Sequence, residues 1–418
     1  MNVLFLHQNF PAQFKHLAPA LAADPANRVV SLTLRAGLPA VWHGVSIHQY
    51  AIRTAPLERQ HPWLSDLETK VIRGEACFQA ARQLRAGGFT PDVVIAHPAW
   101  GESLFIKKVW PQARLGIYCE FFYSAQGVDV GFDPEFAQAD ADVEACRLSL
   151  RNTNHLLHLQ QASLGLSPTR WQADSFPEFF RPRITVVHDG IDTAALCPKP
   201  EARLKLRTDG GLLPLGPSDE LVTFVNRNLE PYRGYHQFMR ALPLLLRRRP
   251  RARVLMVGGN EVSYGAAPRQ GGSWKDIFIA EVKPQMPAEA WARVHFLGKL
   301  PYENFVTLLQ CSRVHVYLTY PFVLSWSLLE AMSIGAAVVA SDTAPLHEVI
   351  EDGVTGRLVP FFDPMRLSQV IGELLDDAPQ RQRLGEAARA RIRAGYDLAG
   401  FCLPAQKEWV RQLADSKG

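Results

Sequence analysis

Short apolar runs recur along the chain and alternate with amphipathic stretches. Such short runs, bounded by polar residues, are typical of strands buried on both faces of a sheet. They predict strands at Val3–Leu6, Val29–Leu32, Val93–Ala96, Leu115–Tyr118, Ile184–Val187, Leu221–Val225, Val254–Val257, Val294–Leu297, Val314–Leu318 and Ala337–Ala340. The stretches between them predict helices, including Gln13–Ala23, Asp66–Arg85, Tyr235–Leu246, Tyr302–Gln310, Leu324–Met332 and Met365–Leu375. Strands that alternate with helices form parallel sheets covered on both faces, so the pattern predicts an α/β fold.

The alternation occurs twice, with a break between the two series. Residues 196–217 are rich in Pro and Gly and show no strong period, so we interpret them as a linker. It separates an N-terminal Rossmann-like domain, residues 1–195, from a C-terminal one, residues 218–396. Residues 397–418 read as a final helix, which we expect to pack back on the N-terminal domain. A chain of 418 residues is long enough for two sizeable cores.

Composition narrows the functional classes. Apolar residues make up 47% of the chain and charged residues 21%, which is ordinary for a globular protein. A net charge of +4 does not indicate nucleic-acid binding. The six cysteines form no CxxC pair, so we expect reduced thiols and neither a zinc site nor a disulfide framework. The sequence shows no signal peptide and no membrane-spanning run, which favours a cytoplasmic protein.

The densest charge cluster is Arg247–Arg253, at the expected end of a helix. Cations at a helix C-terminus complement its dipole, so we interpret the cluster as a solvated helix end. Contact with an anionic acceptor, or peripherally with the inner membrane, is the alternative.

Two arginines follow the strand expected at Leu221–Val225. Arg227 lies just beyond it, and Arg233 opens the next helix. Guanidinium groups beside a helix N-terminus suit a diphosphate, because both the planar donors and the helix dipole favour the anion. The alternative is a pair of exposed arginines that cap a loop.

A second candidate anion site begins at Ser325. A helix that starts there points unpaired N–H groups toward a phosphate, and Glu330 further along it can accept hydrogen bonds from a ribose diol. The alternative is an ordinary Ser cap followed by a solvated Glu.

These segments resemble a known family when they are read together. LVTFVNRNLEPYRGYHQFMRAL and VHFLGKLPYENFVTLLQCSRVHVYLTYPFVLSWSLLEAMSIGAAVVASDTAPLHEVIEDGVTGRLV resemble the nucleotide-sugar domain of family 4 glycosyltransferases. HDGID, residues 188–192, resembles the turn that ends the acceptor domain of that family. The resemblance implies a GT-B fold, in which two Rossmann-like parallel-sheet domains face a central cleft. It also implies metal-independent, retaining transfer from a nucleoside-diphosphate sugar.

The resemblance also assigns residues to the donor site. By position, Arg227 matches a phosphate ligand, Arg233 stands where the family usually has Lys, and Glu330 matches the ribose ligand. The remaining donor-site residues lie in loops and at a helix start that line the nucleotide in the family, and they are Gly258, Gly259, Gly298, Leu300, Ser325, Trp326 and Ser327.

One departure concerns the donor sugar. The first Glu of the family's E-x7-E pair falls on Phe322, and no Asp or Glu occurs between Glu303 and Glu330. We interpret this as an altered enzyme, because the phosphate and ribose positions are intact. The alternatives are a non-catalytic nucleotide-sugar-binding protein and a nucleotide-sugar epimerase of the same fold.

The N-terminal half offers candidates for acceptor chemistry at its strand ends. His97 follows one strand, and Glu120 follows another near a position where many family members have a catalytic His. A carboxylate there can align the acceptor hydroxyl or act as its base. The alternatives are a structural His and a salt-bridged structural Glu.

The turn after the first strand lacks the family's Gly-rich sequence. Asn9 and Gln13 offer donors to a ligand there, and a purely structural turn is the alternative. The absence of G-x-G-x-x-G gives no support to NAD binding.

The sequence therefore predicts a glycosyltransferase with catalytic Glu120 and His97. Its expected substrates are a nucleoside-diphosphate sugar and a hydroxyl of a cell-envelope glycan, glycolipid or protein glycan. We expect no cofactor and no metal, because no carboxylate or histidine cluster with metal-ligand spacing appears in the proposed donor site.

Overall fold

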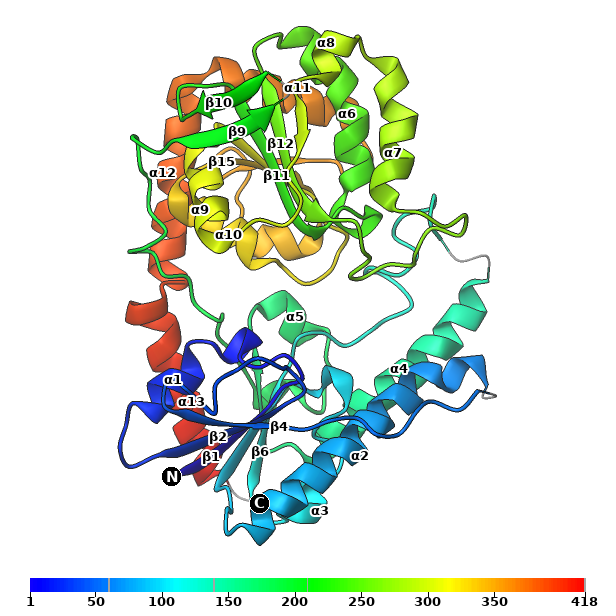
Figure 1. Cartoon of the computed structure of the whole chain (residues 1–418), viewed down its shortest axis with the longest axis vertical. Coiled ribbons are helices and arrows are strands. Elements are labelled where there is room, and N and C mark those ends of the chain that lie inside the picture. Colours follow the sequence, from blue (N-terminus) through cyan, green and yellow to red (C-terminus); the bar gives the residue numbers. More distant parts are fainter. Residues whose placement is uncertain (59–60, 138–139, 209, 417–418) are drawn as a thin grey trace. The chain divides into compact units, whose positions relative to one another are not determined.

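The computed structural model describes residues 1–58, 61–137, 140–208 and 210–416. The chain forms two compact units, each an α/β structure (Figure 1). The first unit contains Met1–Gly190 and Leu398–Gly418, and the second contains Ile191–Asp397. The C-terminal segment thus belongs to the unit that the N-terminal half of the chain builds.

The sheet of the first unit has the strand order β3-β4-β2-β1-β5-β6-β7-β8. All pairs are parallel except β3 with β4. The strands are β1 Asn2–Leu6, β2 Arg28–Thr33, β3 Val41–Trp42, β4 Val45–Gln49, β5 Val93–Ala96, β6 Arg114–Tyr118, β7 Leu164–Ser167 and β8 Ile184–Val186. The chain runs outward from β1 to one side and then returns to β5 on the other. The β1/β5 pair is therefore the switch point, where ligands of open α/β sheets bind.

Helices cover both faces of this sheet (Figure 1). Successive side chains of β1 point to opposite faces, so Val3 and Phe5 pack with α1 and α13, whereas Leu4 and Leu6 pack with α2, α3 and α4. The helices are α1 Leu17–Ala22, α2 Ser65–Ala86, α3 Ile106–Val109, α4 Ala141–Gln161, α5 Arg170–Asp174 and α13 Leu403–Asp415. Short 3-10 turns are η1 Ala12–Phe14, η2 Pro62–Leu64, η3 Pro98–Trp100 and η4 Arg181–Arg183, and η8 Leu398–Cys402 is a π-helical turn.

Helix α13 packs directly on β6. Trp409 and Leu413 are buried there against Gly116. A Cβ at Gly116 would lie 2.6 Å from the Trp409 ring and 2.5 Å from Leu413. The missing side chain of Gly116 therefore allows the indole to reach the sheet.

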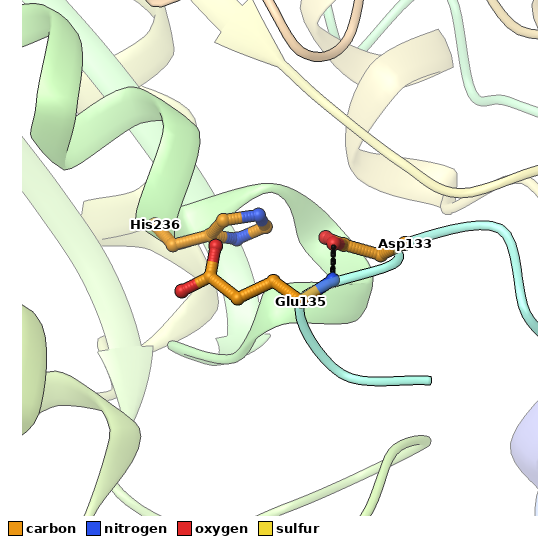
Figure 2. A group of neighbouring side chains, drawn as sticks. All are labelled: Asp133, Glu135 and His236. Atoms are coloured by element: carbon orange, nitrogen blue, oxygen red, sulfur yellow. Dashed lines mark hydrogen bonds between the residues drawn. The ribbon is translucent and has the colours of Figure 1, made fainter. Parts of the chain in front are cut away.

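A polar loop between β6 and α4 is held by local hydrogen bonds. Asp133 accepts from the backbone N–H of Glu135 at 3.0 Å (Figure 2). Asp140 accepts from the N–H groups of Asp142 and Val143 and so caps α4. Short polar side chains thus accept one backbone N–H of this loop and two of the helix that follows it.

The second unit has a doubly wound sheet with the strand order β13-β12-β11-β14-β15-β16. All of its pairs are parallel. The strands are β11 Leu221–Asn228, β12 Arg253–Gly259, β13 Val294–Phe296, β14 Val314–Tyr317, β15 Ala337–Ser341 and β16 Arg357–Val359. This is the 3-2-1-4-5-6 order of a Rossmann fold, and its switch point lies between β11 and β14.

Helices also lie on both faces of the second sheet. One apolar core joins the sheet to α9, α10 and α12, and the ring of Phe224 on β11 stacks with Phe238 on α6. His236 of α6, drawn in Figure 2, is buried beside Phe278 and Phe361. The helices are α6 Tyr235–Arg248, α7 Trp274–Val282, α8 Ala288–Trp291, α9 Tyr302–Cys311, α10 Trp326–Ile334, α11 Pro364–Asp376 and α12 Ala378–Gly395. The 3-10 turns are η5 Pro231–Arg233, η6 Lys283–Gln285 and η7 Ala344–Glu348.

The segment interpreted as a linker carries regular structure. Residues 196–217 include the antiparallel hairpin of β9, Leu204–Thr208, and β10, Gly211–Leu215. Leu206 and Leu215 are buried in the core of the second unit. The interpretation missed these strands because Gly and Pro lie within β10 and on both sides of the short alternation of β9.

The predicted α/β fold is confirmed, and each strand predicted from an apolar run is present. Strands β4 and β7 were missed because His, Gln, Gly and Ser weaken their apolar pattern. Within the described residues, every helix is too short or too polar to cross a bilayer.

We expect Trp409→Ala to lower the free energy of unfolding of the first unit by about 3–5 kcal/mol, because it leaves a large cavity against β6. Denaturant unfolding followed by circular dichroism measures this change. Lys407→Ala, at an exposed position of the same helix, is the matched control. Equal stability of the two variants would show that α13 contributes little to this core.

Candidate functional site

Arg233 joins the two central strands of the second unit. It lies in η5 just after β11, and its Nη1 donates to the hydroxyls of Tyr317 at 3.0 Å and Thr319 at 2.8 Å. The same nitrogen donates to the carbonyl of Val323 at 3.0 Å. Tyr317 ends β14, so these bonds span the switch point of the sheet.

The surroundings of Arg233 are buried and aromatic. Its side chain is only 3% exposed, and the guanidinium lies 4.8 Å from the Tyr264 ring and 5.8 Å from the Phe322 ring. Burial lowers the pKa of Arg233, but the phenol groups of Tyr317 and Tyr264 more than offset this, so the pKa is raised and the charge is kept. Arg233 is therefore neither an exposed arginine that caps a loop nor a guanidinium open to a diphosphate in solvent. Arg227 is the exposed member of the pair.

The N-terminus of α10 is tied to the same tyrosine. The Tyr317 hydroxyl accepts from the backbone N–H of Ser325 at 2.9 Å. Ser325 caps the helix, since its Oγ accepts from the N–H of Ser327 and lies 2.9 Å from the Ser327 hydroxyl. Trp326 begins the helix and is half-buried. One hydroxyl thus connects a buried cation to a helix N-terminus, and both favour an anion.

Glu330 lies within α10 and is 5% exposed, so it is not a solvated carboxylate. The hydroxyl of Tyr302, at the start of α9, donates to its Oε1 at 2.8 Å. Burial and the neighbouring Glu330 raise the pKa of Tyr302, which keeps the phenol protonated as a donor. Nothing in the sequence pattern indicated Tyr302.

The predicted glycines lie where backbone segments approach closely. The N–H of Gly258 donates to the carbonyl of Gly298 at 3.0 Å. A Cβ at Gly259 would lie 2.4 Å from the Asn228 side chain, and Gly298 has a φ of +65°. Leu300 is partly buried against the core. Gly259 therefore has a packing reason to be glycine and Gly298 a conformational one, whatever ligand they line.

A loop after β12 is held by a carboxylate that the sequence analysis missed. Glu230 is buried and accepts from the backbone N–H groups of Ser263, Tyr264 and Gly265 at 3.1–3.3 Å. By binding the backbone N–H of Tyr264, Glu230 holds the Tyr264 ring beside the guanidinium of Arg233. In the sequence, only the position of Glu230 two residues beyond β11 could have indicated a role at this site.

In the first unit, two histidines meet at the switch point. Parallel pairing sets Leu6 beside Ala96, so the next residues, His7 and His97, are neighbours with ring centroids 5.3 Å apart. The Nδ1 atoms accept backbone N–H groups, that of Asn9 at 2.9 Å and that of Ala99 at 3.4 Å. Each ring therefore carries its hydrogen on Nε2.

Glu120, two residues beyond β6, lies beside this pair. Its Oε2 is 3.5 Å from His97 Nε2, and its Oε1 accepts from Gln13 Nε2 at 3.2 Å. The carboxylate side chain is 35% exposed, whereas that of His97 is 1% exposed. The two predicted catalytic residues are thus brought together. A part-exposed carboxylate held by the Gln13 amide and lying near His97 can align a hydroxyl or accept its proton.

In the turn after β1, the predicted contact of Asn9 with a ligand stays a prediction. Its side chain is exposed, and its backbone N–H binds His7. The Gln13 amide forms hydrogen bonds with His7 and Glu120, so in this structure it binds protein groups. The analysis passed over His7, although it follows a strand directly as His97 does.

Comparisons with known proteins agree with this architecture. The family model described as glycosyl transferase family 4 matches residues 25–196, and that described as glycosyl transferases group 1 matches residues 214–391. A D-inositol 3-phosphate glycosyltransferase of Corynebacterium diphtheriae is 30% identical over 171 residues, 40% of this chain and 37% of that protein. A GDP-mannose-dependent phosphatidylinositol monomannoside mannosyltransferase of Mycolicibacterium smegmatis is 28% identical over 226 residues, 53% of this chain and 55% of that protein. The matches thus span from about a third to just over half of these relatives.

Solved structures show the same fold. Sucrose-phosphate synthase of Thermosynechococcus elongatus has a TM-score of 0.74 at 18% identity and covers 100% of both chains. Anabaena HepE in complex with UDP-glucose has a TM-score of 0.67 at 16% identity, covering 99% of this chain and 100% of that one. Two Rossmann-like units of this kind define the GT-B class. The chain belongs to the family 4 glycosyltransferases.

We expect His7 to stay neutral as the Nε2–H tautomer down to about pH 4, because burial and the neighbouring His97 lower its pKa to about 3. Unfolded His7 binds a proton near pH 6.5, so the free energy of unfolding falls as the pH drops from 6.5 toward 3. His7→Gln should make this dependence shallower, by up to about 1.4 kcal/mol per pH unit. Imidazole NMR shifts and denaturant titrations at several pH values measure both effects. A His7 titration midpoint near 6.5 would contradict the burial argument.

Proposed function

We propose that this protein is a retaining glycosyltransferase that moves a sugar from a nucleoside-diphosphate sugar to a hydroxyl acceptor. The observation that carries the proposal is the bonded series Arg233–Tyr317–Ser325 at the switch point of the second unit. It sets a buried cation and a capped helix N-terminus where doubly wound sheets bind nucleotides. The acceptor class is a cell-envelope glycan, glycolipid or protein glycan. The reaction takes place in the cytoplasm, with peripheral membrane contact when the acceptor is lipid-linked.

The donor lies along the strand ends of the second unit. Arg227 and the α10 N-terminus bind the diphosphate. Arg233 holds that helix end in place through its bonds to Val323 and Tyr317. Glu330 accepts from the ribose diol, and the backbone at Gly298 and Leu300 contacts the base. Family membership supports this arrangement, as do relatives whose names specify GDP-mannose or UDP-glucose.

The chemistry needs stabilisation of the leaving diphosphate more than a protein nucleophile. Negative charge that develops on the diphosphate is stabilised by Arg227 and by the helix N–H groups. These fixed positive groups take the place of a metal, so transfer is metal-independent and uses no cofactor. Glu120, with His97 behind it, aligns the acceptor hydroxyl and takes its proton.

Phe322 changes the donor-sugar side of the site. It is buried between the rings of Tyr232 and Tyr264, at centroid distances of 5.6 and 5.2 Å. An aromatic surface accepts no hydrogen bonds from sugar hydroxyls, so donor-sugar selection here follows shape and apolar contact.

The direct test is incubation of the whole chain with a panel of nucleotide sugars and simple glycan acceptors, with and without EDTA. Release of nucleoside diphosphate together with a glycosylated acceptor supports transfer. Binding without turnover supports a non-catalytic protein, and appearance of an epimeric nucleotide sugar supports an epimerase. Loss of activity on chelation, restored by Mg²⁺ or Mn²⁺, would refute metal independence.

We expect Arg233→Met to weaken the affinity for the preferred nucleoside diphosphate at least tenfold, because the α10 N-terminus loses its anchor and the site loses a charge. Arg233→Lys should recover part of the affinity, since one nitrogen makes all three bonds and an ammonium carries three donors. Calorimetric titration measures the affinities, with Arg248→Met at an exposed position as the control. Unchanged affinity in Arg233→Met would remove the cation from the donor site.

We expect Glu120→Gln to lose most sugar transfer while donor affinity stays within twofold, because the amide keeps the shape of the side chain but cannot take a proton. Glu178→Gln, at an exposed position of the same unit, is the control. Transfer rate, donor affinity and melting temperature are measured on one preparation. A lower melting temperature with normal transfer by the folded fraction would make Glu120 structural.

A further inference from the structure

The Gln13 amide lies between two residues of the first switch point. Its Oε1 is 2.9 Å from His7 Nε2, and its Nε2 donates to Glu120 Oε1 at 3.2 Å. His7 follows β1 and Glu120 follows β6, so Gln13 connects the ends of two separate strands. Gln13 itself lies in the 3-10 turn η1, so its backbone is held by that turn.

The direction of these hydrogen bonds is set by the backbone. Because His7 Nδ1 accepts from the N–H of Asn9, its Nε2 must donate, and Gln13 Oε1 must accept. The amide group therefore turns its NH₂ toward Glu120, where it favours an ionised carboxylate. The buried, neutral state of His7 keeps this direction fixed over the working pH range.

The second carboxylate oxygen of Glu120 lies near a ring nitrogen of His97. His97 Nδ1 accepts from the N–H of Ala99, so the ring hydrogen is on Nε2, which lies 3.5 Å from Glu120 Oε2 without forming a hydrogen bond. The His97 ring is held between Trp100 and Tyr118, at centroid distances of 4.5 and 5.2 Å. The Gln13 amide thus donates to one carboxylate oxygen, and the His97 Nε2–H group lies near the other.

We infer that His7 and Gln13 are positioning residues, which hold the carboxylate of Glu120 in one orientation and in its ionised form for an incoming acceptor hydroxyl. The inference rests on the proposed function for the role of Glu120. The orientation itself is a property of the free protein. The titratable groups that face the carboxylate include His97, Tyr118 and Tyr123, with His7 acting through Gln13.

The test compares Gln13→Met, which removes the amide at similar length, with Gln13→Glu, which adds a like charge. The first readout is the ¹³C NMR titration of the Glu120 carboxyl in the free protein, assigned by its absence in Glu120→Gln. We expect the titration midpoint to rise by at least half a pH unit in Gln13→Met and further in Gln13→Glu. Gln83→Met, at an exposed position of α2, should leave it unchanged.

The second readout is the pH profile of transfer. The acid limb of kcat should move with the NMR midpoint and kcat should fall at least fivefold, while KM for the nucleotide sugar stays within twofold. A merely structural glutamine would lower the melting temperature and leave both midpoints in place.

His7 supplies an independent pair of variants should the Gln13 variants fail to fold. His7→Gln keeps an N–H donor within reach of Gln13, whereas His7→Leu removes it. We expect a near-normal carboxyl midpoint in the first variant and a raised one in the second.

The outcomes separate the two proposals. An unchanged carboxyl midpoint in folded Gln13→Met and His7→Leu overturns the positioning role, whatever the activity. A raised midpoint in an enzyme whose Glu120→Gln variant transfers normally supports the positioning and overturns the role of Glu120 in transfer.

Discussion

Both units depend on side chains that reach across the switch point, the pair of strands at which the strand order reverses. In the second unit Arg233 reaches from the end of β11 to Tyr317 at the end of β14. In the first, His7 and His97 follow β1 and β5 and lie side by side. A parallel sheet leaves a crevice at this point because consecutive connections leave toward opposite faces. Bonds across the crevice fix the loops that any ligand meets there.

The sequence predicts the frame of these sites well. Buried parallel strands are nearly continuous apolar runs, so their ends can be read directly, and His97 and Glu120 were found on that basis. Because carboxyl ends of neighbouring parallel strands lie at one edge, residues far apart in the chain were expected to meet. His7 also follows a buried strand directly, so the same reading of strand ends would have included it.

The sequence does not predict which way a side chain turns or what it bonds. Spacing suggested that Arg233 faces a diphosphate, with exposure to solvent as the alternative, yet partners 84–90 residues away bury it. Tyr302 reaches Glu330 from the preceding helix, and no local pattern marks such a pair. The hairpin of β9 and β10 was missed for a different reason, since two five-residue strands in a segment rich in Gly and Pro resemble a linker until a core is present to cover them.

The division of the chain into units has a consequence for biogenesis. Residues 398–418 complete the first unit, although the whole of the second unit precedes them in the chain. On the ribosome, β5 and β6 therefore emerge long before the helix that covers one of their faces, and that face stays open until Trp409 has been synthesised. The second unit is continuous in the chain and can close first, because domains fold as their residues become available. During this interval the nascent first unit exposes an apolar sheet surface, which is the kind of surface that chaperones bind.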